Sequence, residues 1–255
     1  MDSSSENTYL SRIEDLEKKV SRLEAKDEIR NLMSRFAFLQ SSARYKEIMD
    51  DLFSKRKDRS YEEGYSGVYT DDKFSPDLIL SYFKNRYGCY EDEASREKLK
   101  GNLVTNAFSS PFIEVSEDCM SARGYWITIG QETIVLSDGE RSGVPSIDEM
   151  QPDENGKRHR VYWIWQKYDV EFIREDGSWR ILHMHAYEAA RGTYHKDWVE
   201  YSRERYADDQ MQDSEIRFGE SPTHASYPTT YHQQYSTEEI PSQIPLPPTD
   251  DGKAE

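Results

Sequence analysis

The chain has 255 residues, of which 35% are hydrophobic, 32% are charged and 13% are aromatic, so a core fits inside only part of its length. Its formal net charge of −16 argues against a general nucleic-acid binder and against a protein that binds anionic membrane surfaces, because a protein that binds either partner needs clustered Lys and Arg. Since no apolar run is long enough to cross a bilayer and no signal pattern is present, we expect a cytoplasmic protein.

A short heptad repeat lies near the start of the chain. Its apolar residues recur at spacings of four, three, four and three: Tyr9, Ile13, Leu16, Val20 and Leu23. This spacing is typical of the a and d positions of a coiled coil, although two heptads are short for an autonomous one. We therefore expect residues 1–26 to form a helical extension. It would pair with another subunit in a homodimer or homotrimer, lie back on its own domain, or stay mobile.

A second amphipathic stretch follows, and its apolar residues at helical spacing should face a core: Ile29, Leu32, Met33, Phe36 and Leu39. Ser41 and Ser42 mark a break, after which residues 45–53 are expected to form a further helix. Ser75 and Pro76 resemble an N-cap followed by proline at the first helical position, which predicts a short helix over residues 77–87.

From Leu103 onward the pattern is that of β-strands, with strand-like runs at residues 111–117, 121–136 and 160–187. Residues 137–159 are expected to form a polar loop, and residues 195–208 a short helix. Six of the ten prolines lie between residues 222 and 248. Residues 213–255 are therefore expected to be an extended, partly disordered tail that can wrap along the domain surface.

The segment Val161–Tyr187 predicts two long strands joined by a tight turn, because Asp-Gly between two alternating runs is a strong hairpin signal. Side chains two apart in a strand share a face, so His183 and His185 should lie together. Pairing across an even-length turn places Tyr168 opposite His185 and adds the apolar residues Val170, Phe172, Trp179 and Ile181. Two imidazoles and a phenol on an apolar face indicate either a small-molecule pocket or a hydrogen-bonded core.

The other face of this hairpin is expected to carry two carboxylates, Asp169 and Glu171, together with Trp165, Lys167, Arg180 and Met184. Two carboxylates two residues apart can indicate general acid–base chemistry. The neighbouring cations Lys167 and Arg180 favour a salt-bridged ladder instead.

Four blocks of sequence, in this order, resemble the SnoaL-like branch of the nuclear-transport-factor-2-like superfamily over roughly Glu14–Tyr201. They are IEDLEKKVSRLEAKDEIRNLMSRFAFLQ, PFIEVSEDCMSARGYW, WQKYDVEFIREDGSWRILHMH and GTYHKDW. The resemblance implies an α+β cone at residues 27–212, in which a curved antiparallel β-sheet wraps around N-terminal helices and encloses a pocket. It also implies pairing or trimerisation through the outer sheet. The superfamily contains cyclases, dehydratases and isomerases as well as binding domains, so function must come from the site.

Dehydratase-like relatives use a Tyr and an Asp on or near the first helix and a His on a neighbouring strand. These positions align here with Phe36, with Ser41 or Ser42, and with Asn106. Phe36 cannot donate a hydrogen bond, neither serine can act as a carboxylate base, and Asn106 cannot exchange a proton at neutral pH. Any catalysis must therefore use other residues.

The leading hypothesis is a lyase, dehydratase, isomerase or cyclase acting on a hydrophobic cyclic or aromatic substrate. His183 or His185 would move a proton beside a carbonyl, and Tyr168 and Asn106 would polarise its oxygen. Further candidates for contact with the ligand are Phe36, Gln40, Trp126, Val170 and Trp179. The alternative is a non-catalytic ligand-binding or assembly protein of the same fold.

Neither a cofactor nor a metal ion is expected. The sequence has no glycine-rich phosphate loop and no G-x-S-x-G elbow, which disfavours nucleotide-dependent and serine-hydrolase chemistry. Two histidines two apart can chelate a metal, but no third ligand is evident. Cys89 and Cys119 are the only cysteines, too few for a disulfide framework.

Overall fold

The computed structural model describes residues 3–55, 100–136, 154–156 and 158–201, and single residues at 203, 235, 237, 240, 247 and 248. Within them, α1 (Ser3–Ser41) is followed by α2 (Tyr45–Glu47) and one π-helical turn, η1 (Ile48–Leu52). Four strands follow: β1 (Leu103–Val115), β2 (Ser121–Leu136), β3 (Arg158–Glu175) and β4 (Ser178–Thr193). They form one antiparallel sheet in the order β1-β2-β3-β4.

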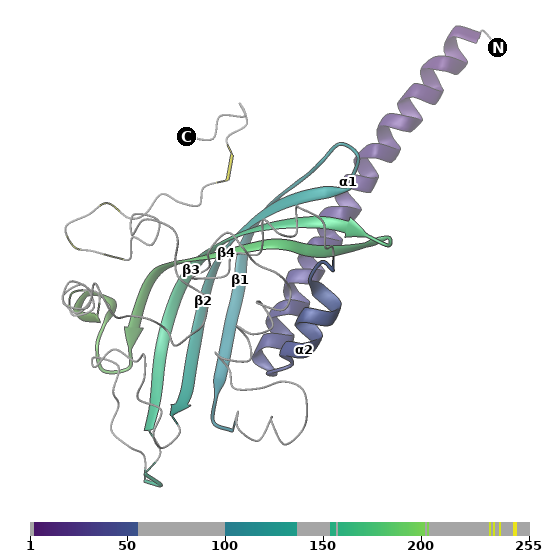
Figure 1. Cartoon of the computed structure of the whole chain (residues 1–255). Coiled ribbons are helices and arrows are strands. Elements are labelled where there is room, and N and C mark those ends of the chain that lie inside the picture. Colours follow the sequence, from purple (N-terminus) through teal and green to yellow (C-terminus); the bar gives the residue numbers. More distant parts are fainter. Residues whose placement is uncertain are drawn as a thin grey trace.

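The sheet is curved, and α1 and α2 pack against one of its faces (Figure 1). We call this face the inner face. The predicted α+β architecture, with N-terminal helices on a curved antiparallel sheet, is confirmed. The helix expected at residues 77–87, most of the loop at 137–159 and most of the tail at 213–255 lie outside the described residues. The proposed domain boundaries, at residues 26 and 212, stay predictions; α1 itself passes through residue 26 without a break.

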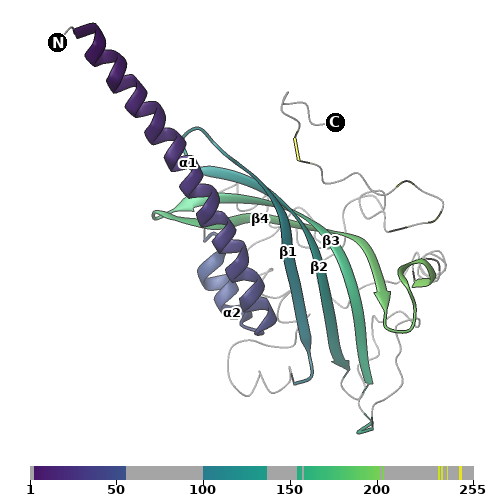
Figure 2. The ribbon, with the colours of Figure 1, turned by 180° about the vertical axis from the view of Figure 1, so that it is seen from behind.

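One stripe of α1 packs on the sheet because its apolar residues recur at helical spacing. The buried residues of this stripe are Ala25, Ile29, Met33, Phe36 and Leu39. The helix ends where predicted, since Ala43 adopts a left-handed conformation with φ 54. The Arg44 N–H then donates to the Leu39 carbonyl oxygen at 2.9 Å, which closes the helix end. Residues before Ala25 project beyond the sheet (Figure 2).

The hairpin between β3 and β4 turns through Asp176 and Gly177, whose φ angles are 48 and 80. Two successive positive φ values between paired Glu175 and Ser178 define a type I′ turn, as the Asp-Gly dipeptide predicts. β1 starts at Leu103, eight residues before the predicted run at residue 111, and carries an irregularity between Ser109 and Phe112. This break in register explains why the strand does not show one continuous alternation.

β4 is an edge strand whose backbone is partly covered. The Ser54 N–H, just after η1, donates to the Ile181 carbonyl oxygen at 2.8 Å. The Tyr235 N–H, from the segment predicted as a tail, donates to the Ala189 carbonyl oxygen at 2.9 Å. These contacts satisfy carbonyl groups that an open edge would present to other chains.

Candidate functional site

A β-bulge at Leu182 decides which face of the sheet the histidines of β4 occupy. Glu171 pairs with His183 whereas Phe172 pairs with Ile181, so Leu182 is an extra residue with no partner of its own. Beyond the bulge the faces exchange, and Met184 rather than His183 is buried, at 2% exposure. The predictions that His183 lies inward and that Met184 lies outward are therefore wrong.

The second histidine is also displaced from its predicted neighbour. The register pairs His185 with Asp169, and Tyr168 with Ala186. The predicted placement of Tyr168 opposite His185 is wrong because the bulge at Leu182 shifts the register by one residue. The structure describes the backbone of His185 but not its side chain. It therefore does not bring the three proposed catalytic residues together in one site.

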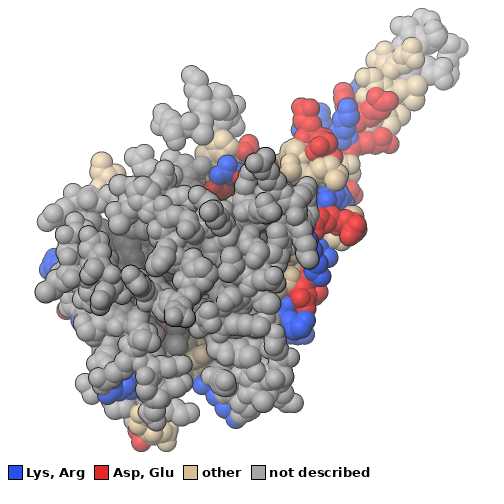
Figure 3. All heavy atoms as spheres, viewed as in Figure 1, with Lys and Arg blue, Asp and Glu red and all other residues tan. Residues whose placement is uncertain are grey.

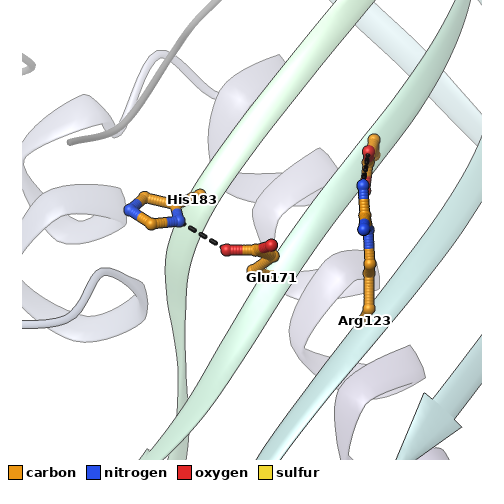
Figure 4. Close-up of polar contacts among 4 residues, drawn as sticks. Arg123, Glu171 and His183 are labelled. Carbon is orange, nitrogen blue, oxygen red and sulfur yellow. Dashed lines mark hydrogen bonds and ion pairs between the residues drawn. The ribbon is translucent and has the colours of Figure 1, made fainter. Parts of the chain in front are cut away.

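The outer face carries paired polar side chains from three strands (Figure 4). Arg123 of β2 makes two hydrogen bonds to the Asp169 carboxylate, from Nε at 2.8 Å and from Nη2 at 2.5 Å. His183 Nδ1 lies 2.5 Å from Glu171 Oε2. The two carboxylates face outward and are paired, as predicted: Asp169 pairs with Arg123, and Glu171 with the His183 imidazole.

Pairing and burial shift the pKa values of three side chains on this face. The hydrogen bond to Asp169 raises the pKa of Arg123 above its ordinary value, against the opposing effect of burial. Burial, and then the charge of Asp169, raise the pKa of the Tyr125 phenol. Burial lowers the pKa of Lys167. The outer cluster thus joins β2, β3 and β4 through polar side chains that are already paired, which is a structural role rather than an open site.

The inner face carries a connected set of aromatic rings. Phe108 lies at its centre, with its ring centroid 4.8 Å from Tyr168, 5.9 Å from Phe36 and 6.5 Å from Trp126. The predicted ligand-contacting residues Phe36, Trp126, Val170 and Trp179 all belong to this buried core. Phe108 is half-buried and was not predicted, because it precedes the strand expected at residue 111, although Val104, Asn106 and Phe108 alternate as a strand would.

Polar side chains occupy one half of the inner face. Asn106 donates from Nδ2 to Gln40 Oε1 at 3.1 Å, and the Tyr168 hydroxyl donates to Gln166 Oε1 at 3.3 Å. Glu132 and Arg191 form a buried ion pair at 3.9 Å. We call this set, together with buried Thr128, the polar half: Gln40, Asn106, Thr128, Glu132, Gln166, Tyr168 and Arg191. It extends from the C-terminal end of α1, where Gln40 lies, toward the end of the sheet where β2 finishes and β3 begins, away from the N-terminal part of α1 (Figure 2).

The alternation of β2 is inverted in this half. Thr128 and Glu132 face inward and are buried, whereas Ile127 and Ile129 face outward and are 50% and 52% exposed. A simple amphipathic interpretation of this strand would place the isoleucines in the core. Thr128 and Glu132 were missed for this reason, and only the pairing with β1 and β3 identifies their face.

Two glycines make room for functional side chains on the inner face. A Cβ atom at Gly130 would collide with the Asn106 side chain and lie 2.6 Å from the Thr105 carbonyl oxygen. A Cβ atom at Gly124 would collide with the indole of Trp126. The absence of side chains at these positions therefore fixes where the Asn106 amide and the Trp126 ring can lie.

The described residues show neither a metal-binding cluster nor a membrane-spanning helix. No group of three or more His, Cys, Asp or Glu side chains there is arranged to hold a metal ion. None of the helices in that part of the chain combines the length and the apolar character needed to span a bilayer.

Comparison with known proteins identifies the family to which this chain belongs. The family model of the SnoaL-like domain matches residues 21–185. A search of curated proteins finds no match. A proposed scytalone dehydratase from Novosphingobium aromaticivorans is 13% identical, with 69% of this chain and 92% of that chain covered and a TM-score of 0.45. A hexachlorocyclohexane dehydrochlorinase, LinA type 2, is 12% identical, with 69% and 92% covered and a TM-score of 0.44.

An NTF2-like protein of unknown function from Pseudomonas putida is 12% identical, with 64% of this chain and 86% of that chain covered and a TM-score of 0.41. The family assignment depends on the family model alone. Because that model spans more than half of the chain, this protein belongs to the SnoaL-like domain family, as the four sequence blocks predicted.

Proposed function

We propose that this protein binds a hydrophobic cyclic or aromatic small molecule on the polar half of the inner face. The observation that carries the proposal is the exposure of Asn106 and Phe108. Both are half-buried on a face whose other residues are mostly buried, so an amide and an aromatic ring stay accessible side by side on β1. Apolar walls with a few converging polar groups are typical of small-molecule sites.

Each group on this face has a distinct use. A flat ring can pack edge-to-face or offset against Phe108, as Tyr168 already does. The amides of Asn106 and Gln40 can both donate and accept hydrogen bonds, and so can exchange their mutual bond for bonds to a ligand carbonyl or hydroxyl. The proposed ligand therefore combines a ring with at least one oxygen atom.

The proposal is tested with 1-tetralone, a bicyclic aromatic ketone, by titration calorimetry on the full chain. The variants Asn106→Leu and Phe108→Ala should each weaken binding by about tenfold, from the loss of a hydrogen bond or a ring contact. The matched controls Thr105→Val and Ile129→Ala lie on the outer face of the same sheet and should bind as the native chain does. An equal loss in inner-face and outer-face variants, or no binding at all, would refute the proposal.

Lyase or isomerase chemistry on such a ligand is a second candidate function. The buried pair of Glu132 and Arg191 favours it, because a buried carboxylate can take a proton from carbon beside a carbonyl. The Arg191 guanidinium or the Tyr168 hydroxyl would then stabilise the negative charge on the oxygen. His183 takes no part in this version of the mechanism, because it lies on the outer face with Glu171.

Proton abstraction can be measured without knowledge of the substrate. The hydrogens of 1-tetralone beside its carbonyl exchange with deuterium in D₂O, and nuclear magnetic resonance follows the rate. If the second function holds, the native chain accelerates exchange, Glu132→Gln abolishes the acceleration, and the outer-face control Glu171→Gln retains it. Binding without accelerated exchange would leave the protein as a non-catalytic binder.

A further inference from the structure

The part of α1 before the sheet carries an apolar seam that faces solvent. Its members are 50% to 67% exposed: Tyr9, Ile13, Leu16, Val20 and Leu23. We call residues 7–24 the arm. Side chains this large and apolar seldom remain exposed in a row unless they meet a partner.

The seam points away from its own domain. With about 100° of rotation per residue, the seam is centred on the opposite side of α1, about 180° from the stripe that begins at Ala25 and packs on the sheet. Beyond Leu23 the outward side of the helix is polar at Asp27, Asn31 and Ser34, all of them exposed, and Phe38, 75% exposed, is a single apolar residue further along this side rather than a continuation of the repeat. The apolar seam is thus confined to the projecting arm, and its geometry excludes packing against its own sheet.

The residue types along the seam favour two parallel strands. Ile13 and Val20 are β-branched and occupy a positions, whereas Leu16 and Leu23 occupy d positions. The combination of β-branched residues at a positions with Leu at d positions favours parallel two-stranded coiled coils. The arm is short, but its helix is already formed and anchored by α1 in the domain, so pairing does not carry the cost of helix nucleation.

The charges beside the seam select the orientation. Arg12 and Lys19 fall at g positions, and Glu17 and Glu24 fall at e positions five residues later. In a parallel pair in register, each g residue meets the e residue of the second copy that lies five positions further on, which brings Arg12 to Glu17 and Lys19 to Glu24. An antiparallel pair would bring g to g and e to e, so every such contact would join like charges.

The four charges are available for this purpose. None of them forms an ion pair with another residue in the described part of the chain, and all four are exposed. Acidic and basic side chains are interspersed along the arm (Figure 3). From the opposed stripes, the a and d residues and the g-to-e charges, we propose that the arm pairs with the arm of a second copy as a parallel, in-register, two-stranded coiled coil.

A cross-link localises the contact to the seam. In the full chain with Cys89→Ser and Cys119→Ser, a Leu16→Cys variant should form an intermolecular disulfide on mild oxidation, because d positions face each other across a parallel pair. The matched control Lys18→Cys lies at f, on the far side of the helix, and should remain monomeric on a non-reducing gel. Equal cross-linking at the two positions would indicate association that does not involve the seam, such as association through the outer sheet, and overturns the proposal. The absence of cross-linking at residue 16 overturns it as well.

A charge exchange tests the orientation. In sedimentation equilibrium, Lys19→Glu should weaken dimerisation by about tenfold, because two attractive contacts per dimer become repulsive. The double variant Lys19→Glu with Glu24→Lys should restore it. An antiparallel pair would respond in the opposite direction, since the introduced carboxylate would then face Arg12, so stronger association of the single variant overturns the parallel arrangement. A native chain that stays monomeric at all concentrations overturns the proposal as a whole.

Discussion

The ion pair of Glu132 and Arg191 allows a sharp test of the inner face. Their side chains are 4% and 9% exposed, and the charged atoms are 3.9 Å apart. At this distance, with an effective dielectric constant of about 20, the attraction is about 4 kcal/mol. Desolvation of each ion costs several kcal/mol, so the pair as a whole contributes close to nothing to the free energy of unfolding.

Removing one partner leaves a buried charge without this attraction. We therefore expect Arg191→Met and Glu132→Met each to lower the free energy of unfolding by about 3–5 kcal/mol. The double variant should lie within about 1 kcal/mol of the native chain, because apolar residues of similar length replace both ions. Urea denaturation followed by tryptophan fluorescence measures all four chains. Single variants within about 1 kcal/mol of the native chain, or a double variant equal to their sum, would refute the reasoning.

Three further predictions concern the geometry of the sheet. Gly124→Ala should displace the Trp126 indole and lower the free energy of unfolding by about 1–3 kcal/mol, with a red shift of the tryptophan fluorescence. An unchanged emission maximum would contradict this prediction. Deletion of Leu182 should remove the bulge and move the side chains of the remainder of β4 to the opposite faces of the sheet. The free energy of unfolding should fall by more than about 3 kcal/mol in denaturation experiments, and native-like stability would count against the register. The pKa of the Tyr125 phenol is raised in the folded chain. The contribution of the protonated phenol to the free energy of unfolding is therefore present below about pH 10, and it is lost as the pH rises through the folded-state pKa. Stability of the Tyr125→Phe variant should fall less steeply than that of the native chain in alkaline solution, and identical slopes would contradict the shift.

Local signals in the sequence identified the elements that depend on neighbouring residues. The Asp176-Gly177 turn follows from its own φ requirements, and the buried stripe of α1 follows from helical spacing. Phe36 was placed in the core correctly, because its helical spacing puts it on the same stripe as Ile29 and Met33. The family was also predictable, since four ordered blocks carry it.

The faces of β2 and β4 were not predictable in the same way. A bulge adds one residue, and on β4 its trace in the sequence is the apolar doublet Ile181-Leu182, which an uninterrupted strand can also contain. On β2 the polar residues face inward and the isoleucines outward, which reverses the usual sign of the pattern. In both strands the deciding energy lies in the pairing with neighbouring strands, and this is a long-range property. The proposed site therefore differs from the predicted one: it lies at Asn106 and its neighbours rather than at the histidines of β4.

The geometry of α1 connects the two proposals. The seam and the buried stripe lie on opposite sides of one helix, so two paired arms leave both domains on the outside of the dimer, and each inner face is built from a single chain. Disrupting the arm with Leu16→Asp and Val20→Asp should therefore convert the dimer to a monomer and leave the affinity for 1-tetralone unchanged. Light scattering and calorimetry on the same samples measure the two quantities. A parallel loss of mass and affinity would mean that the second copy completes the site, which the position of the polar half at the opposite end of the sheet argues against.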